Sequence, residues 1–326
     1  MKDNIIANRM RARSIFLQLI IGIVIIAFIL NKLDINEIIS VLIKTDYLFF
    51  ILACVSYLFL NIILAGRLNY LLARIGYNTG YPTVFFSHMG GMIVGDITPG
   101  RSGYFLTPPI LKKNAGTKIT DGMACIFAPQ GIEFILKVAG AVAAIFYISS
   151  RTTISKDLLI SVSIGAVLLL VAGILMLIIS WHSENMTSRF ISKLPFFKRF
   201  TEKLSFFKER SIQIKGSLNA ILILYLIGWV FAGLQWFYLG KALGIQLPFI
   251  AFFLLHPLIT ILMFVPISPA GLGLMEGGVI LVFSLFGILP ATALAFSVLV
   301  RVSILLVDLI GLKTVLSSLH YSDIIS

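Results

Sequence analysis

Two short polar motifs interrupt the apolar stretches of this sequence, one in each half of the chain. The first is residues 97–103 (ITPGRSG), and the second is residues 267–273 (ISPAGLG), with Glu276 three positions further on. Proline lacks a backbone donor and clashes with the preceding turn, so each motif is expected to end one half-helix and begin another. Non-helical backbone is tolerated in a bilayer only where protein buries it or where it lines a wet cavity. Two breaks at corresponding places of two halves therefore indicate a transport site.

Arg101 gives the first break its chemistry. It follows Pro99 and Gly100 at the predicted start of a half-helix, where free N–H groups and the positive end of the helix dipole favour an anion. A planar guanidinium can bind two phosphate oxygens at once, so the pattern predicts a phosphate site. In the alternative interpretation, Arg101 pairs with Asp96 and only holds the hairpin together.

Glu276 lies in the first turn of the half-helix that follows the second break. It either caps the free amides of that turn, or it binds a proton or pairs with a cation during transport. We expect the substrate to contact both breaks and one arginine in the middle of a later span. The predicted substrate-binding residues are Thr98, Pro99, Gly100, Arg101, Gly103, Ser268, Gly271, Gly273, Glu276 and Arg301.

Other ionisable residues inside apolar segments are candidates for coupling, because charges within a membrane are functional by default. Glu133 and Lys137 are four residues apart, and they form either an internal pair or a part of the substrate path. His88 and His256 precede the two breaks at similar distances, and they are either proton carriers or packing residues. Asp96 completes this group.

The composition excludes a soluble globular protein. Hydrophobic residues make up 59% of the 326 residues and charged residues only 12%, which indicates a polytopic membrane protein. The formal net charge of +12 lies mostly between the apolar runs, where the positive-inside rule places lysine and arginine, so we expect no nucleic-acid partner. The sequence has no Walker loop, GxSxG motif, HExxH motif or zinc-spaced cysteine pair. We therefore expect that the protein is not an enzyme and has no catalytic residues. We also expect that it binds neither a metal nor another cofactor.

The apolar runs predict an all-α membrane protein with about six full transmembrane helices and two re-entrant helical hairpins. The hairpins enclose the two breaks, and a short helix over 35–43 is expected at the outer interface. The predicted spans are residues 14–30, 47–66, 119–149, 158–181, 217–240 and 292–316.

Three crossings separate the hairpins, so the single membrane domain, residues 1–326, is predicted to be an inverted repeat of the halves 1–150 and 151–326. The two tips should then meet near the midplane from opposite faces, with Arg101 and Glu276 in one shared cavity. The lysine and arginine distribution predicts that both termini are cytoplasmic. The basic segment 182–216 is expected to bind anionic headgroups of the cell membrane.

At the two breaks the chain resembles the lysylphosphatidylglycerol synthase transmembrane-region family, also called flippase-like proteins. Members look like Pro-Gly-x-x-Gly-Glu in the first half and Pro-Ile-Ser-Pro-Gly-Gly-Leu-Gly-x-x-Glu in the second. Here the second motif reads PISPAGLGLME over residues 266–276, and Arg301 follows. The chain departs from the family pattern at Tyr104, where the first motif has Glu, and at Ala270, where the second has Gly. Gln130 and Gly131 fall near a Glu-Arg pair of relatives.

The resemblance implies movement of anionic or aminoacylated lipids, or of polyprenyl-phosphate-linked sugars, across the bilayer. Some relatives carry a fused soluble domain that transfers aminoacyl groups, and this chain lacks it, so a synthase is not expected. The leading hypothesis is a lipid flippase or a related transporter. The alternative is a non-transporting membrane subunit that docks a glycosyltransferase or lipid synthase through its basic segment. An oligomer is compatible with either hypothesis.

Overall fold

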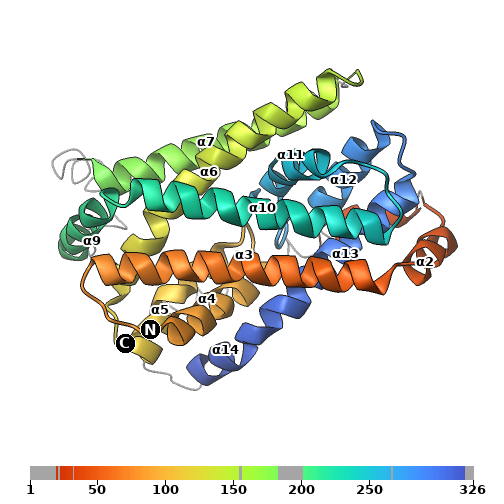
Figure 1. The fold of residues 1–326 in the computed structure, drawn as a ribbon. Helices are drawn as coiled ribbons and strands as arrows, with labels where there is room; N and C mark the ends of the chain where they lie inside the picture. Colours follow the sequence, from red (N-terminus) through yellow and green to blue (C-terminus); the bar gives the residue numbers. More distant parts are fainter. Residues whose placement is uncertain are drawn as a thin grey trace.

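A computed structural model describes residues 20, 23–31, 33–153, 156–182, 201–265 and 267–319, and these residues form helices without a β-strand (Figure 1). The chain is thus an all-α polytopic membrane protein, as predicted. Its long helices are α3 (Tyr47–Arg74), α6 (Ile119–Ser149), α7 (Lys156–Trp181), α10 (Leu218–Ala242) and α13 (Pro290–Asp308). Its short peripheral helices are α2 (Ile35–Ile43), α9 (Thr201–Lys215) and α14 (Leu312–Leu319).

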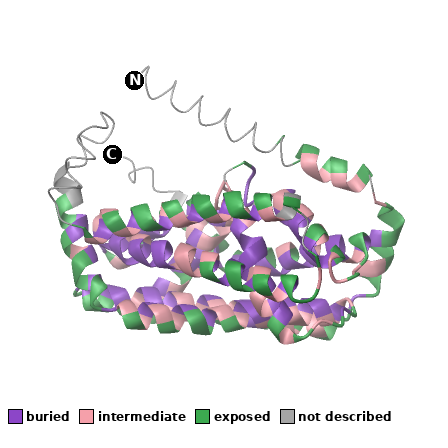
Figure 2. Ribbon diagram, turned by 90° about the horizontal axis from the view of Figure 1, so that it is seen from above, coloured by how far each residue is buried: buried purple, intermediate pink, exposed green. Residues whose placement is uncertain are grey.

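Five helices of the described part are long and apolar enough to cross a membrane. They correspond to five of the six predicted spans, and the last of them continues from α13 through the 3₁₀ turn η4 (Leu309–Gly311) into α14. The first predicted span, 14–30, lies mostly outside the described residues, although residues 23–31 are helical where they are described. Buried residues run along the inside of the bundle and exposed residues along its outside (Figure 2).

The bundle has two ends, which we call the α2 end and the α9 end after the helices found there (Figure 1). Helix α3 runs from the α2 end to the α9 end, and α10 runs back beside it. The N–H of Asp46, which caps α3, donates to the carbonyl of Ala242 at the end of α10 (3.0 Å). The two helices are therefore antiparallel and in contact over their length. Helices α6 and α7 form a second antiparallel pair.

Two helical hairpins enter this bundle from opposite ends, as predicted (Figure 1). The first hairpin, from the α9 end, consists of α4 (Tyr81–Asp96), the 3₁₀ turn η1 (Ser102–Leu106) and α5 (Thr107–Ala115). The second, from the α2 end, consists of α11 (Phe249–Thr260), the 3₁₀ turn η3 (Ile261–Phe264) and α12 (Leu274–Ser284). The longest of these helices has 16 residues, or about 24 Å, less than the ~30 Å of a bilayer core.

The described part of the basic segment folds onto the bundle. Helix α9 contacts α6 and α7, and it buries Lys208 and Ile214. The Lys208 ammonium donates to the carbonyl of His182 (2.7 Å), and Arg210 lies 3.5 Å from Asp121 of α6. Residues 183–200 lie outside the described residues, so headgroup binding by this segment stays a prediction.

Close packing of backbone on backbone joins the first hairpin to the last span. A methyl group at Gly311 of η4 would overlap the backbone of Met89 and Gly90 in α4. By contrast, a methyl group at Gly277 of α12 would meet no atom within 4 Å.

We therefore expect Gly311→Ala to destabilise the protein by about 1–3 kcal/mol, because α4 and η4 must move apart. Gly277→Ala is the matched control, and it should be neutral or stabilising by up to about 1 kcal/mol through helix propensity. Thermal unfolding in detergent micelles measures both. Equal midpoints for the two variants would contradict the close packing of α4 against η4.

Candidate functional site

The tips of the two hairpins touch each other, as predicted. Pro99 and Pro269 form an isolated antiparallel bridge, and the N–H of Ala270 donates to the carbonyl of Thr98 (3.1 Å). This hydrogen bond satisfies one backbone group of each tip, in a part of the chain where no helix supplies a partner. This mutual contact is the centre of the candidate site.

The two tips also share one backbone conformation. In each, two successive N–H groups donate to the carbonyl three residues back, at 3.2 and 3.1 Å over residues 98–102 and at 3.2 and 2.9 Å over residues 268–272. Positive φ angles occupy the two positions after each proline: Gly100 (58°), Arg101 (54°), Ala270 (42°) and Gly271 (67°). A non-glycine residue in this region costs about 1–2 kcal/mol. Such strain is kept mainly at functional sites.

The hydroxyl residues of the predicted site are used inside the turns. Thr98 donates to the carbonyl of Val94 (3.0 Å) and accepts from the N–H of Gly103 (2.7 Å). Ser268 donates to the carbonyl of Leu272 (2.8 Å). These side chains shape the tips rather than presenting free donors.

Helix α13 holds the first tip through a carboxylate. The Arg101 guanidinium lies 2.5 Å from Asp96 of its own hairpin and 3.8 Å from Asp308 at the end of α13. The hydroxyl of Tyr57 on α3 donates to the same Asp308 (3.0 Å). The pairing of Arg101 with Asp96, which the sequence left as an alternative, is present.

Helix α13 holds the second tip through a guanidinium. Arg301 forms an ion pair with Glu276, and it also lies 3.4 Å from the carbonyl of Ala270 in the tip. Glu276 accepts from the N–H of Gly273 (2.7 Å), so it caps the first turn of α12. One helix therefore supplies a charged partner to each tip, Asp308 to the first and Arg301 to the second.

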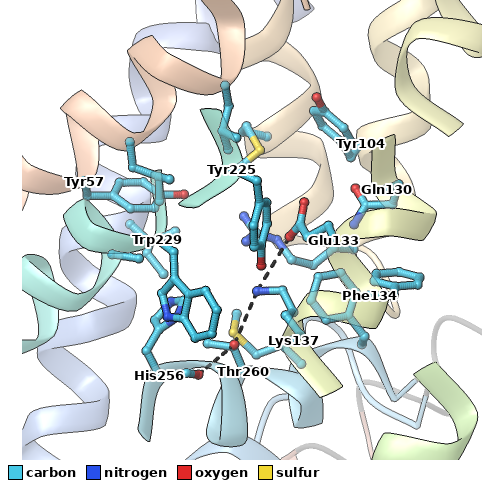
Figure 3. Close-up of a pocket in the computed structure, with 18 of the residues that line it drawn as sticks. Tyr57, Tyr104, Gln130, Glu133, Phe134, Lys137, Tyr225, Trp229, His256 and Thr260 are labelled. Carbon is cyan, nitrogen blue, oxygen red and sulfur yellow. Dashed lines mark hydrogen bonds and ion pairs between the residues drawn. The ribbon is translucent and has the colours of Figure 1, made fainter. Parts of the chain in front are cut away.

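A central cavity of about 120 Å³ lies among α3, α6, α10, α13 and both hairpins (Figure 3). Aromatic rings, including Tyr57, Tyr225 and Trp229, line much of it. Of the predicted site and coupling residues it contains His88, Gly100, Arg101, Glu133, Lys137 and His256.

Polar groups in this cavity form a short chain across α6 and α11 (Figure 3). Lys137 lies 3.6 Å from Glu133 and donates to the hydroxyl of Thr260 (3.5 Å). Thr260 in turn donates to the carbonyl of His256 (2.7 Å). The Glu133–Lys137 pair is present as one of the two predicted possibilities.

His88 is fully buried between two polar partners. Its ring nitrogens lie 3.1 Å from the Tyr104 hydroxyl and 3.1 Å from the Asn61 side chain. Tyr104, which departs from the family motif, therefore has a defined role in holding this histidine. Among the described residues, no group of three or more His, Cys, Asp and Glu side chains could hold a metal ion.

Glu276 and Arg301 do not face the central cavity, contrary to the expectation of one cavity shared with Arg101. They line a separate side cavity of about 240 Å³, which is otherwise apolar and lies against helical residues 23–31. Val300 of α13 lines the central cavity and Arg301 lines the side cavity. The reason is helical geometry, because adjacent residues on a helix point about 100° apart.

Sequence reasoning missed Arg67. The predicted span ended at residue 66, but α3 continues to Arg74 and buries Arg67 at the wall of the central cavity. The leucines at 68, 71 and 72, which continue a helical spacing beyond Arg67, were the available signal. These three leucines are buried in the protein, whereas Tyr70 on the same segment is exposed.

The pair of Glu276 and Arg301 should stabilise the fold only as a pair. Glu276→Gln and Arg301→Gln are each expected to cost about 3 kcal/mol, because the first leaves the partly buried Arg301 guanidinium, and the second the buried Glu276 carboxylate, without its partner. The double variant should lose clearly less than the sum, which a double-mutant cycle on thermal unfolding in detergent measures. Glu37→Gln, on the exposed face of α2, is the control and should change little. Additive losses would contradict the coupling.

Comparison with known proteins matches this amino-acid sequence to a family of membrane proteins. The UPF0104 membrane protein MJ1595 of Methanocaldococcus jannaschii is 25% identical over 324 residues, covering 90% of this chain and 91% of that protein. A UPF0104 membrane protein of Methanothermobacter thermautotrophicus is 21% identical over 320 residues, covering 91% and 93%. The family model of the lysylphosphatidylglycerol synthase TM region matches residues 15–311. The chain therefore belongs to the family of the lysylphosphatidylglycerol synthase TM region.

Proposed function

We propose that this protein is a lipid flippase, moving an anionic, aminoacylated or polyprenyl-phosphate-linked lipid across the cell membrane. The observation that carries the proposal is the contact between the two hairpin tips beside a cavity lined with charged residues. Broken helices that enter from opposite sides and meet at the centre are the usual scaffold of alternating access. Separation of the tips on one side or the other would open the central cavity to one leaflet at a time.

Ionisable groups in the central cavity support transport over a purely structural role. Arg67, Arg101, Glu133 and Lys137 all line it, and charged side chains inside a membrane are costly and mark substrate paths. The same side chains give no nucleophile with an adjacent base, so we propose transport without chemical change of the lipid. No cofactor is part of this proposal.

The charge distribution supports a cytoplasmic α9 end and cytoplasmic termini. That end carries Arg74, Lys112, Lys113, Lys118, Lys208, Arg210 and Lys215. The α2 end carries Lys44, Arg151, Lys156 and Lys241 among the described basic residues, together with Asp34, Glu37 and Asp46. Basic residues are concentrated in cytoplasmic loops by the positive-inside rule.

Cysteine accessibility tests this orientation. In a variant without Cys54 and Cys125, a membrane-impermeant maleimide added to intact cells should label Glu37→Cys at the α2 end. It should label Asn114→Cys at the α9 end only after the membrane is opened, since both positions are exposed to solvent. The reverse labelling pattern would invert the proposed topology.

A disulfide across the tips tests whether their separation is needed for transport. Pro99 and Pro269 form a non-hydrogen-bonded antiparallel pair, for which the Cα atoms are about 4.5 Å apart, within the range of a disulfide. In liposomes, Pro99→Cys/Pro269→Cys protein without its native cysteines should move labelled phosphatidylglycerol or polyprenyl phosphate when reduced. Oxidation should reduce the rate at least about tenfold, and reduction should restore it.

The two single-cysteine variants are the controls, and the oxidant should leave their transport rates unchanged. Undiminished transport by the oxidised double variant would contradict alternating access through the tips. If no tested lipid crosses, and a glycosyltransferase or lipid synthase instead co-purifies with the protein in stoichiometric amount, the non-transporting subunit is the better description.

A further inference from the structure

Arg67 is a buried cation, and two of its three donor nitrogens have no acceptor among the described residues. Its side chain lines the central cavity from α3, and the residue is only 4% exposed. Two of its guanidinium nitrogens, Nε and Nη1, have no hydrogen-bond partner in the described structure. Leaving a charge buried without a partner costs several kcal/mol, unless a ligand supplies the missing acceptor.

Gln130 offers a further donor to the same cavity from α6. The residue is 7% exposed, and its amide nitrogen Nε2 also has no hydrogen-bond partner in the part of the chain described. Guanidinium and amide nitrogens can only donate. Three unused N–H-bearing nitrogens at one cavity therefore suit a group rich in acceptor oxygens.

The other cations of the cavity wall already have carboxylate partners. Arg101 contacts Asp96 and Asp308, and Lys137 contacts Glu133. The ion pairs formed by the described residues do not include Arg67. The cavity thus presents one positive charge without a counterion of its own.

We propose that Arg67 and Gln130 bind the phosphate of a phosphodiester headgroup with a single net negative charge. A guanidinium and a neutral amide suit phosphate oxygens in both charge and geometry. A zwitterionic headgroup would bring its ammonium beside Arg101 and Lys137, so we expect the cavity to disfavour it. The inference rests on the proposed function for the lipid nature of this ligand, and on Arg67 and Gln130 for its phosphate.

Lipid binding by the purified protein in a neutral detergent tests this selectivity. Titration with phosphatidylglycerol should raise the unfolding temperature of the wild-type protein, whereas phosphatidylethanolamine with the same chains should have little effect. Arg67→Gln should weaken phosphatidylglycerol binding about tenfold or more and remove the preference. Native mass spectrometry of the same samples counts the bound lipids.

Arg74→Gln is the matched control, because it removes the same charge from an exposed position on the same helix. It should keep the preference for phosphatidylglycerol. Ligand-free Arg67→Gln protein should unfold at the wild-type temperature or above, since the variant loses an unpaired buried charge. A lower unfolding temperature with unchanged lipid preference would give Arg67 a structural role and overturn the inference.

Two further ligands separate the phosphate from the chains. Oleate, an anionic lipid without phosphate, should not replace phosphatidylglycerol, and equal binding of both would overturn the phosphodiester assignment. Glycerophosphoglycerol, which has the headgroup without chains, should bind more weakly but still depend on Arg67; equal affinity would support a soluble phosphodiester as the source. If the protein binds phosphatidylglycerol selectively but does not transport it in liposomes, the flippase proposal is refuted and this inference stands. If the protein transports lipid but Arg67→Gln leaves lipid binding unchanged, this inference is refuted and the flippase proposal stands.

Discussion

The structure depends on the need to satisfy backbone polar groups where two helices are broken inside a membrane. Water and lipid cannot do this in the hydrocarbon core, where each unsatisfied group costs several kcal/mol. Each tip first satisfies backbone groups through its own turn hydrogen bonds, over residues 98–102 and 268–272. They then contact each other through the bridge of Pro99 with Pro269. The hairpins enter from opposite ends of the bundle, so their short helices reach one central point from both sides and their tips can pair there.

Helix α13 makes the two tips depend on a single element. Asp308 contacts Arg101, while Arg301 contacts Glu276 and the Ala270 carbonyl. The two α13 residues have opposite charge and lie about two helical turns apart, so each matches one tip. A buried ion pair does not tolerate the loss of one partner. We infer that a displacement of α13 must change the charge environment of both tips together, which favours discrete arrangements over gradual opening.

Much of the fold was predictable because membranes impose strong constraints on sequence. Apolar length identified five spans that the structure contains, and the two prolines located both breaks. Local pairs were also within reach: Arg101 with Asp96, and Glu133 with Lys137, are separated by five and four residues. The pairing of Glu276 with Arg301 was not predictable, because it arises from the packing of α12 against α13 rather than from spacing. As a result, Glu276 lies with Arg301 at the side cavity and not in the cavity that it was expected to share with Arg101.

Arg101 and Arg67 show why a motif and a ligand site need not coincide. Arg101 lies in the most conspicuous motif of the chain, yet its guanidinium is paired with two carboxylates. Its charge therefore serves mainly to hold the tip in place. Arg67 belongs to no motif and looks like an ordinary charge near the end of a span, yet two of its donor nitrogens have no partner among the described residues. In a low-dielectric interior, an unpaired charge interacts far more strongly with an incoming ion than a paired one does. The capacity to bind an anion therefore lies with the arginine whose partners are missing, and only the folded arrangement distinguishes the two.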